Sequence, residues 1–326
     1  MMSVAAAVAA TNQVRWTPTP SRAAKEWFHF CVVTPGLTAF CNLSLSEGAD
    51  GRVLALARIG DEPRWHGGQR SHAATAIGQR VCVGDSFMEW RGGRYLVRAR
   101  ASGVEIDLEL VPLTVPLVAE KVDLAPGWLG WVAIPRLSAS GTVRAGGQTF
   151  RLDAAPGYHD HNWGEWRWGG GDFAWQWGFA LDDRETSVLY SRLTDRARCR
   201  TFDTKVSVWR GALLQRVFAG RAVRVDTVGR APTTGLRRVP AVMELVVPGE
   251  GVEAPRSLDV TASLGDDWLA LRYQPEALAQ VAIANEADFG FTLIDETSGR
   301  FVVKGRIDGV DLGFEGRSLF EFVSFE

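Results

Sequence analysis

The sequence predicts a nearly all-β protein with two barrel-like or sandwich-like domains. Three observations support this: apolar and polar residues alternate strictly in several segments, glycine-rich turns separate those segments, and no segment sustains an amphipathic helix of three turns. The 326 residues suggest about two domains of ordinary size. Two eight-stranded barrels, each enclosing about one small ligand, fit this length.

The alternation is clearest in two segments. Over 104–110 apolar residues alternate with acidic ones, which is typical of an antiparallel strand with one buried face. Over 173–179 one face of the expected strand is entirely aromatic, with Phe173, Trp175, Trp177 and Phe179.

Several short sequences predict turns between strands. The pairs Gly92-Gly93 and Gly146-Gly147 are expected to join hairpins, and Asp182-Asp183 and 297–299 to form further tight connections. The only short helix expected lies in 275–285.

The domain boundaries follow from composition. Residues 1–20 are expected to be a flexible tail, because the alanine-rich start has no basic segment before it. A first domain is expected over 21–195 and a second over 196–326, so that the boundary follows the hairpin that begins with the aromatic strand at 173–179. An alternative boundary lies in 228–239. No apolar run reaches the roughly 18 residues of a membrane span, so we expect a cytoplasmic protein, associated with membranes at most through its substrate.

The composition points to an apolar small-molecule ligand. The net charge of −2 gives no electrostatic reason to expect nucleic acid as a partner. Thirteen tryptophans beside four tyrosines indicate either a pocket walled by indole rings or two cores rich in Trp. The four cysteines contain no CxxC pair, which argues against a structural zinc site. The oligomeric state is left open.

The most informative segment is Gly-Tyr-His-Asp-His-Asn-Trp-Gly at 157–164. In an extended conformation its side chains alternate between two faces, with His159, His161 and Trp163 on one and Tyr158, Asp160 and Asn162 on the other.

This geometry leaves three interpretations open. In the first, an imidazole exchanges a proton with a substrate while Asp160 orients the segment from behind. In the second, the His-x-His pair binds a metal with Asp172 or Glu165; we expect no metal, because no third ligand has convincing spacing. In the third, the polar residues form a buried structural network.

The octapeptide resembles the carotenoid 1,2-hydratase (hydroxyneurosporene synthase) and AttH-like superfamily. Two flanking sequences agree with this resemblance: Glu-Trp-Phe-His-Phe at 26–30 is similar to the opening of the family, and Gly-Phe-Glu-Gly-Arg-Ser-Leu-Phe-Glu at 313–321 to its closing strand. The resemblance implies two lipocalin-like β-domains and an apolar, unsaturated substrate. The superfamily includes hydratases, terpenoid cyclases and decalin-forming Diels–Alderases, so the resemblance also implies that no organic cofactor is needed.

The sequence departs from the hydratase pattern in one place. That pattern pairs His-x-Trp with a downstream Tyr-x-Asp, whereas Tyr190 is followed two residues later by Arg192. Because protonating an isolated alkene needs a strong acid, hydration would require a substitute such as Asp172 or Glu165.

We therefore expect a cofactor-independent cyclase or isomerase acting on a polyene, polyketide or terpenoid, by a pericyclic or a cationic route. The alternatives are a hydro-lyase that adds water to an isoprenoid double bond, and a non-catalytic carrier. The expected catalytic residues are His161, His159, Tyr190 and Asp172. The expected substrate-binding residues are Trp163, Trp175, Trp177, Phe179 and Trp27. The expected supporting residues are Asp160, Asn162, Tyr158 and Glu26. As part of a cavity wall, His161 is expected to tolerate truncation with a modest loss of stability.

Overall fold

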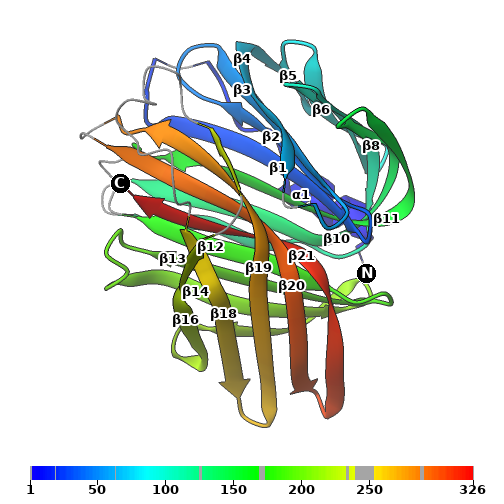
Figure 1. Cartoon of the computed structure of the whole chain (residues 1–326), viewed down its shortest axis with the longest axis vertical. Coiled ribbons are helices and arrows are strands. Elements are labelled where there is room, and N and C mark those ends of the chain that lie inside the picture. Colours follow the sequence, from blue (N-terminus) through cyan, green and yellow to red (C-terminus); the bar gives the residue numbers. More distant parts are fainter. Residues whose placement is uncertain are drawn as a thin grey trace. The chain divides into compact units, whose positions relative to one another are not determined.

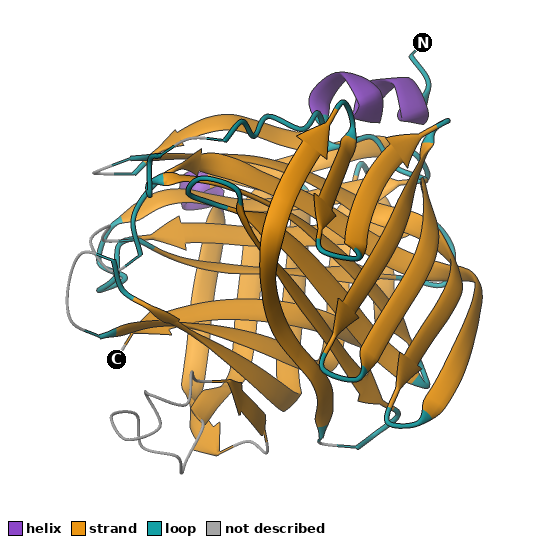
Figure 2. Cartoon of the chain, turned by 90° about the horizontal axis from the view of Figure 1, so that it is seen from above, coloured by secondary structure: helices purple, strands orange, loops and turns teal. Residues whose placement is uncertain are grey.

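The computed structural model confirms the predicted fold class. It describes residues 2–18, 20–62, 64–124, 127–168, 173–232, 235–238, 253–286 and 290–325. Strands make up most of the chain, with one short helix, α1 (Val4–Thr11), and one 3-10 turn, η1 (Gly220–Ala222) (Figures 1 and 2). None of the helices in these ranges has the length and apolar character needed to cross a membrane.

The chain divides into two compact units. The first comprises Met1–Glu62 and His66–Arg167, and the second Pro63–Trp65 and Trp168–Glu326. The division after Arg167 differs from the predicted boundary at 195. The physical reason is that the aromatic strand pairs with strands of the second unit, so the chain changes units before this strand rather than after it.

The first unit is built on one eleven-stranded sheet. Its strands are β1 (Ala24–Thr34), β2 (Leu37–Leu45), β3 (Asp50–Ile59), β4 (Trp65–Ile77), β5 (Arg80–Val83), β6 (Ser86–Arg91), β7 (Arg94–Ala101), β8 (Val104–Pro112), β9 (Leu117–Asp123), β10 (Trp128–Ala145) and β11 (Gln148–Glu165). The order is β11-β1-β2-β3-β4-β5-β6-β7-β8-β10-β9, and β11 also pairs with β10. This extra pairing closes the sheet into a barrel with β9 outside the ring.

Strand β11 forms the seam of this barrel. It pairs with β1 on one side and with β10 on the other, both antiparallel. The predicted turn Gly146-Gly147 connects β10 to β11, and both glycines have the positive φ that such a turn requires. Gly92-Gly93 connects β6 to β7 in the same way.

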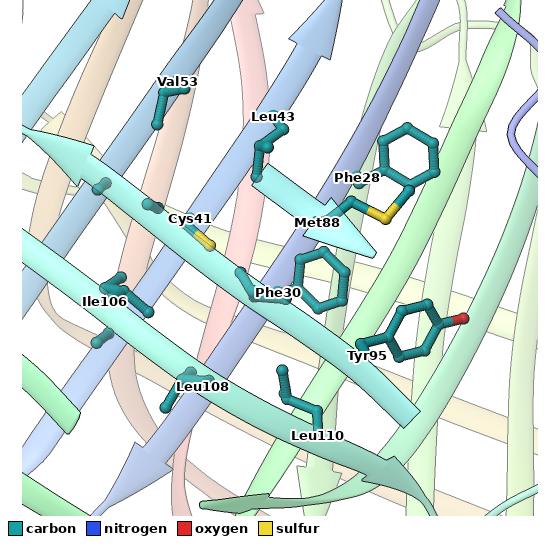
Figure 3. Packing of buried hydrophobic residues seen from close by; sticks show 14 of the residues in the cluster. Phe28, Phe30, Cys41, Leu43, Val53, Met88, Tyr95, Ile106, Leu108 and Leu110 are labelled. Atoms are coloured by element: carbon teal, nitrogen blue, oxygen red, sulfur yellow. The ribbon is translucent and has the colours of Figure 1, made fainter. Parts of the chain in front are cut away.

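The interior of the first unit is filled by side chains. Phe28 and Phe30 of β1 pack with Tyr95 of β7 and with the apolar face of β8, which alternates as the sequence predicted (Figure 3). The barrel interior is therefore a packed core in which polar groups need partners.

The N-terminal segment differs from the expected loose tail. Ser3 caps α1 by accepting a hydrogen bond from the Ala6 amide, and Val8 is fully buried in the core of the first unit. The alanine-rich run favours a helix because alanine has the highest helix propensity, and the buried valine anchors it.

The second unit is built on one ten-stranded sheet. Its strands are β12 (Ala174–Leu181), β13 (Thr186–Thr194), β14 (Thr201–Arg210), β15 (Leu213–Ala219), β16 (Val223–Pro232), β17 (Gly235–Arg238), β18 (Glu253–Leu264), β19 (Asp267–Ala284), β20 (Phe291–Ile307) and β21 (Val310–Phe325). The order is β15-β14-β13-β12-β21-β20-β19-β18-β16, and β17 pairs with β19. The alternative boundary at 228–239 lies partly outside the described residues.

Two predictions for this unit are wrong. Residues 275–285 were expected to be helical, but β19 continues through them to Ala284 and pairs with β20. Residues 297–299 were expected to be a turn, but they lie in the middle of β20. Glycine is needed at 299 because the backbone of the neighbouring strand lies very close: a Cβ on Gly299 would lie 2.2 Å from the carbonyl oxygen of Gln274.

Candidate functional site

Strand β11 carries the octapeptide in an extended conformation, and its two faces are separated as the alternation predicts. His159 and His161 face the interior of the first unit, where they lie against Phe30 and Phe28 of β1. Asp160 lies on the opposite face of the strand and is also buried. The octapeptide therefore has two buried faces with different surroundings.

The inner face holds a buried hydrogen-bond network centred on His161. Its Nε2 lies 2.6 Å from Oε1 of Glu26, and its Nδ1 lies 2.5 Å from Oδ1 of Asn12. His161 is completely buried, and Glu26 and Asn12 are 2% and 5% exposed. Glu26 was expected in a supporting role, and the structure places its carboxyl directly on the imidazole.

The backbone amide of Arg15 completes the surroundings of Glu26. It donates to both carboxyl oxygens, at 2.9 and 3.3 Å. The guanidinium of this exposed residue lies 4.0 Å from the ring centroid of Trp163, in cation–π geometry.

His159 extends the network through Asn12. Its Nδ1 lies 2.8 Å from the carbonyl oxygen of His29, and its Nε2 lies 2.7 Å from Nδ2 of Asn12. The same amide nitrogen donates to the hydroxyl of Tyr95. Both nitrogens of both imidazoles thus have partners within the first unit.

Burial governs the charge of these groups. Burial lowers the pKa of His159 well below its usual value, and it lowers the pKa of His161 although the hydrogen bond and charge of Glu26 oppose the shift. Burial likewise raises the pKa of Tyr95. At neutral pH His159 and Tyr95 are therefore uncharged.

The hydrogen bond between His161 and Glu26 holds one proton. An imidazole nitrogen and a carboxyl oxygen at 2.6 Å need a hydrogen between them, since two lone pairs at that distance would repel each other. The proton resides either on the carboxyl or on the imidazole. The pair is chemically suited to general acid–base catalysis.

On the opposite face, Asp160 organises its neighbours along the strand. Its carboxylate accepts hydrogen bonds from the Tyr158 hydroxyl at 2.8 Å and from the Asn162 side-chain amide at 2.7 Å. Trp27 also lies on this side of the barrel wall, packed edge-on against Trp166 with ring centroids 5.1 Å apart. These residues do not meet His161.

In the second unit, the aromatic strand β12 packs against a buried acid on β21 that the sequence did not reveal. The indole N–H groups of Trp175 and Trp177 both donate to Oε1 of Glu321, the latter at 3.0 Å. Phe179 stacks next to Trp177 with centroids 6.4 Å apart. The expected substrate-binding residues of β12 therefore surround a carboxyl group on β21.

Glu321 has a second acid as its cross-strand neighbour. Glu296 lies directly opposite on β20 and is hydrogen-bonded to it, which requires a proton between the two carboxyl groups. Burial raises the pKa of Glu321, against the opposing effect of the hydrogen bonds from Glu296 and the two indoles.

The remaining expected catalytic residues lie elsewhere. Tyr190 donates to Oε1 of Gln176 at 2.8 Å and packs in the core of the second unit, on the other side of the sheet from Trp177. Asp172 lies outside the described residues. Glu165, at the end of β11, is exposed. Within the described ranges, no three His, Cys, Asp or Glu side chains are grouped as metal ligands.

Three participants were not identified from the sequence. Asn12 and Arg15 come from the segment before β1, which has no motif that would have identified them. Glu321 falls within the closing sequence at 313–321, so the family resemblance was the one signal for it.

Comparison with known proteins supports the fold. No protein-family profile matches the sequence, and no curated protein is similar to it. Three solved structures have the same fold at 13% identity: an AttH-type protein from Nitrosomonas europaea, kievitone hydratase from Nectria haematococca, and CghA. Their TM-scores are 0.65, 0.61 and 0.61. The matches cover 93%, 94% and 93% of this chain, and 93%, 90% and 89% of the respective structures. This agrees with the AttH-like fold that the octapeptide implied, and a likeness at this identity establishes the fold alone.

Proposed function

We propose that the protein is a cofactor-independent cyclase or isomerase that acts on an apolar, unsaturated molecule of polyene, polyketide or terpenoid type. The observation that carries this proposal is the 2.6 Å hydrogen bond between His161 and Glu26, two buried side chains that lie beside aromatic rings. A proton donor of this kind protonates a carbonyl or an activated double bond, which starts a cyclisation or shifts the double bond, and its conjugate base removes a proton at the end.

Aromatic rings beside His161 would stabilise a positive charge that forms on the substrate. Phe28 stacks on His161 at 4.2 Å, and Trp163 lies 5.0 Å from it. The guanidinium of Arg15 occupies the face of Trp163, which marks a position where a cation is stabilised by roughly 0.5–2 kcal/mol. In the proposed reaction the exposed Arg15 side chain moves away and the substrate takes its place over the indole.

A second candidate is a hydratase, and Glu321 is the observation that favours it. Hydration needs a carboxylic acid that stays protonated at neutral pH, and burial raises the pKa of this carboxyl between Trp175 and Trp177. This acid lies on the other face of the sheet from Tyr190 and Arg192, so it would act from a different position than the Asp that the sequence lacks two residues after Tyr190. Kievitone hydratase, which has the same fold, is a hydratase by name.

Isotope labelling separates the candidates. The full chain is incubated with a panel of linear isoprenoid and polyketide-derived polyenes, in D₂O and in parallel in ¹⁸O-water. We expect a product with the same mass as its substrate in ordinary water, one deuterium on carbon in D₂O, and no ¹⁸O. A product that gains one water carrying ¹⁸O would establish the hydratase instead. A compound that binds but is recovered unchanged would establish a carrier.

Matched variants test the acid. Glu26→Gln keeps the shape of the side chain and removes the carboxyl group that shares the proton with His161, so turnover should fall at least tenfold. Glu109→Gln on the exposed side of β8 is the control and should keep full turnover. A product of unchanged mass that carries no deuterium and forms equally well with Glu26→Gln would contradict a role for this proton in the reaction. The protein would then be a purely pericyclic cyclase.

A further inference from the structure

Asn12 is the link between the two histidines of β11. Its amide nitrogen faces Nε2 of His159 and its amide oxygen faces Nδ1 of His161, at 2.7 and 2.5 Å. Because an amide has a donor end and an acceptor end, its orientation determines which hydrogens both imidazoles carry.

The hydrogen positions follow from His159. Its Nδ1 faces a backbone carbonyl oxygen, that of His29, which can only accept, so this nitrogen carries the hydrogen. The ring is neutral because burial lowers its pKa, and its Nε2 is therefore an acceptor. Asn12 must therefore turn its NH₂ group, and not its oxygen, toward Nε2 of His159.

The reversed amide orientation conflicts with these surroundings. With its oxygen toward His159, Asn12 would require hydrogens on both ring nitrogens, and hence a charged imidazolium. That ring is fully buried and stacked on Phe30, with centroids 4.1 Å apart, where an unpaired charge is costly.

The orientation of Asn12 then determines the state of His161. Its amide oxygen accepts from Nδ1, so this nitrogen carries a hydrogen whether or not the ring is charged. The Nε2 position is left for the proton that is shared with Glu26.

We infer that Asn12 is a positioning residue, which fixes the hydrogen of His161 on Nδ1 and so reserves Nε2 for the proton shared with Glu26. Its catalytic consequence rests on the proposed function, whereas the hydrogen positions are a property of the protein alone. Without Asn12, His161 could donate an Nε2 hydrogen to a Glu26 carboxylate as a neutral imidazole, which is a far weaker acid than the shared proton.

Nitrogen NMR on protein labelled with ¹⁵N-histidine tests the inference, and the chain has only five histidines to assign. In the wild-type protein we expect a hydrogen on Nδ1 of both His159 and His161. Asn12→Leu, which has similar size but no polar atoms, should reduce the fraction of His161 with that hydrogen. Asn12→Asp keeps an acceptor for His161 and should preserve its Nδ1 hydrogen, while changing His159. A wild-type His161 protonated on Nε2 alone, or an unchanged His161 in Asn12→Leu, would overturn the inference.

A control separates positioning from loss of stability. Val53→Ala removes buried apolar volume from the same core without touching the network, and should leave the histidine signals unchanged. With a substrate in hand, Asn12→Leu should lower kcat at least tenfold with little change in KM, and Asn12→Asp should recover part of it. If Glu26→Gln retains full turnover, the proposed function fails, while the NMR result still decides the role of Asn12.

Discussion

Phe28 and His161 lie directly opposite each other on β1 and β11, with their ring centroids 4.2 Å apart and the ring planes inclined by 18°. The next pair on this face, Phe30 and His159, repeats the arrangement at 4.1 Å and 10°. Each imidazole is thus held by stacking on one side and by hydrogen bonds in its own plane. The octapeptide is consequently part of the packed core as well as the candidate site.

Glu26→Ala should destabilise the protein far more than Glu26→Gln. Alanine leaves the His161 imidazole and the Arg15 amide without their partner, at a cost of about 1–3 kcal/mol, whereas glutamine still donates to one and accepts from the other. Urea unfolding of the two variants measures the difference. Equal stabilities would mean that the hydrogen bond between Glu26 and His161 contributes little to folding.

His161→Ala and Asp160→Ala should both lose about 1–3 kcal/mol or more, because each leaves two buried partners unpaired. The sequence predicted only a modest loss for His161. Its complete burial and its two polar partners lead to the larger value. Thermal melts of both variants test this; a His161→Ala protein as stable as the wild type would mean that the inner network can rearrange without cost.

Stability should fall as the pH is lowered below about 6.5. Burial lowers the pKa of His29 to about 3, so between these values the unfolded chain binds a proton that the folded chain does not. Each such histidine lowers the free energy of unfolding by up to about 1.4 kcal/mol for each pH unit below 6.5. Urea unfolding between pH 7 and 5 should show a smaller slope for His29→Gln than for the wild type. His72→Gln, at an exposed position, is the control; identical slopes for all three proteins would contradict the prediction.

Gly130→Ala should displace Trp163. A Cβ on Gly130 would lie 2.2 Å from Cε2 of that indole, which overlaps its van der Waals volume and should cost about 1–3 kcal/mol. Gly36→Ala is a suitable control because no atom lies within 4 Å of its Cβ position. Tryptophan fluorescence and melting temperature report the change, and a variant with wild-type values in both would show that the indole has room to move.

The period-two pattern predicted what depends on one strand alone. It separated His161 from Asp160 because neighbouring side chains on a strand point to opposite faces. It gave no information on pairing between distant segments, so Asn12 and Glu321 were missed. Glu321 is 144 residues from Trp177 in sequence, and only the register of β12 against β21 brings them together.

Local propensity was misleading where tertiary pairing outweighs it. The alanine-rich segment at 275–285 favours a helix in isolation, but hydrogen bonding to β20 along its length makes it a strand. The same propensity operates unopposed in α1, which no sheet pairs with. The composition of the two segments is similar, and their neighbours decide the outcome.

The closure of the first barrel by β11 has a consequence for how the chain folds. Glu26 and His161 are 135 residues apart, so their contact forms only after a very long loop has been closed. Contacts of such high sequence separation slow folding, and β11 has to find β1 and β10 together. The two histidines of the octapeptide therefore gain their partners at a late step. A chain halted before that step would still display an unpaired edge on β1, the kind of edge through which β-proteins aggregate.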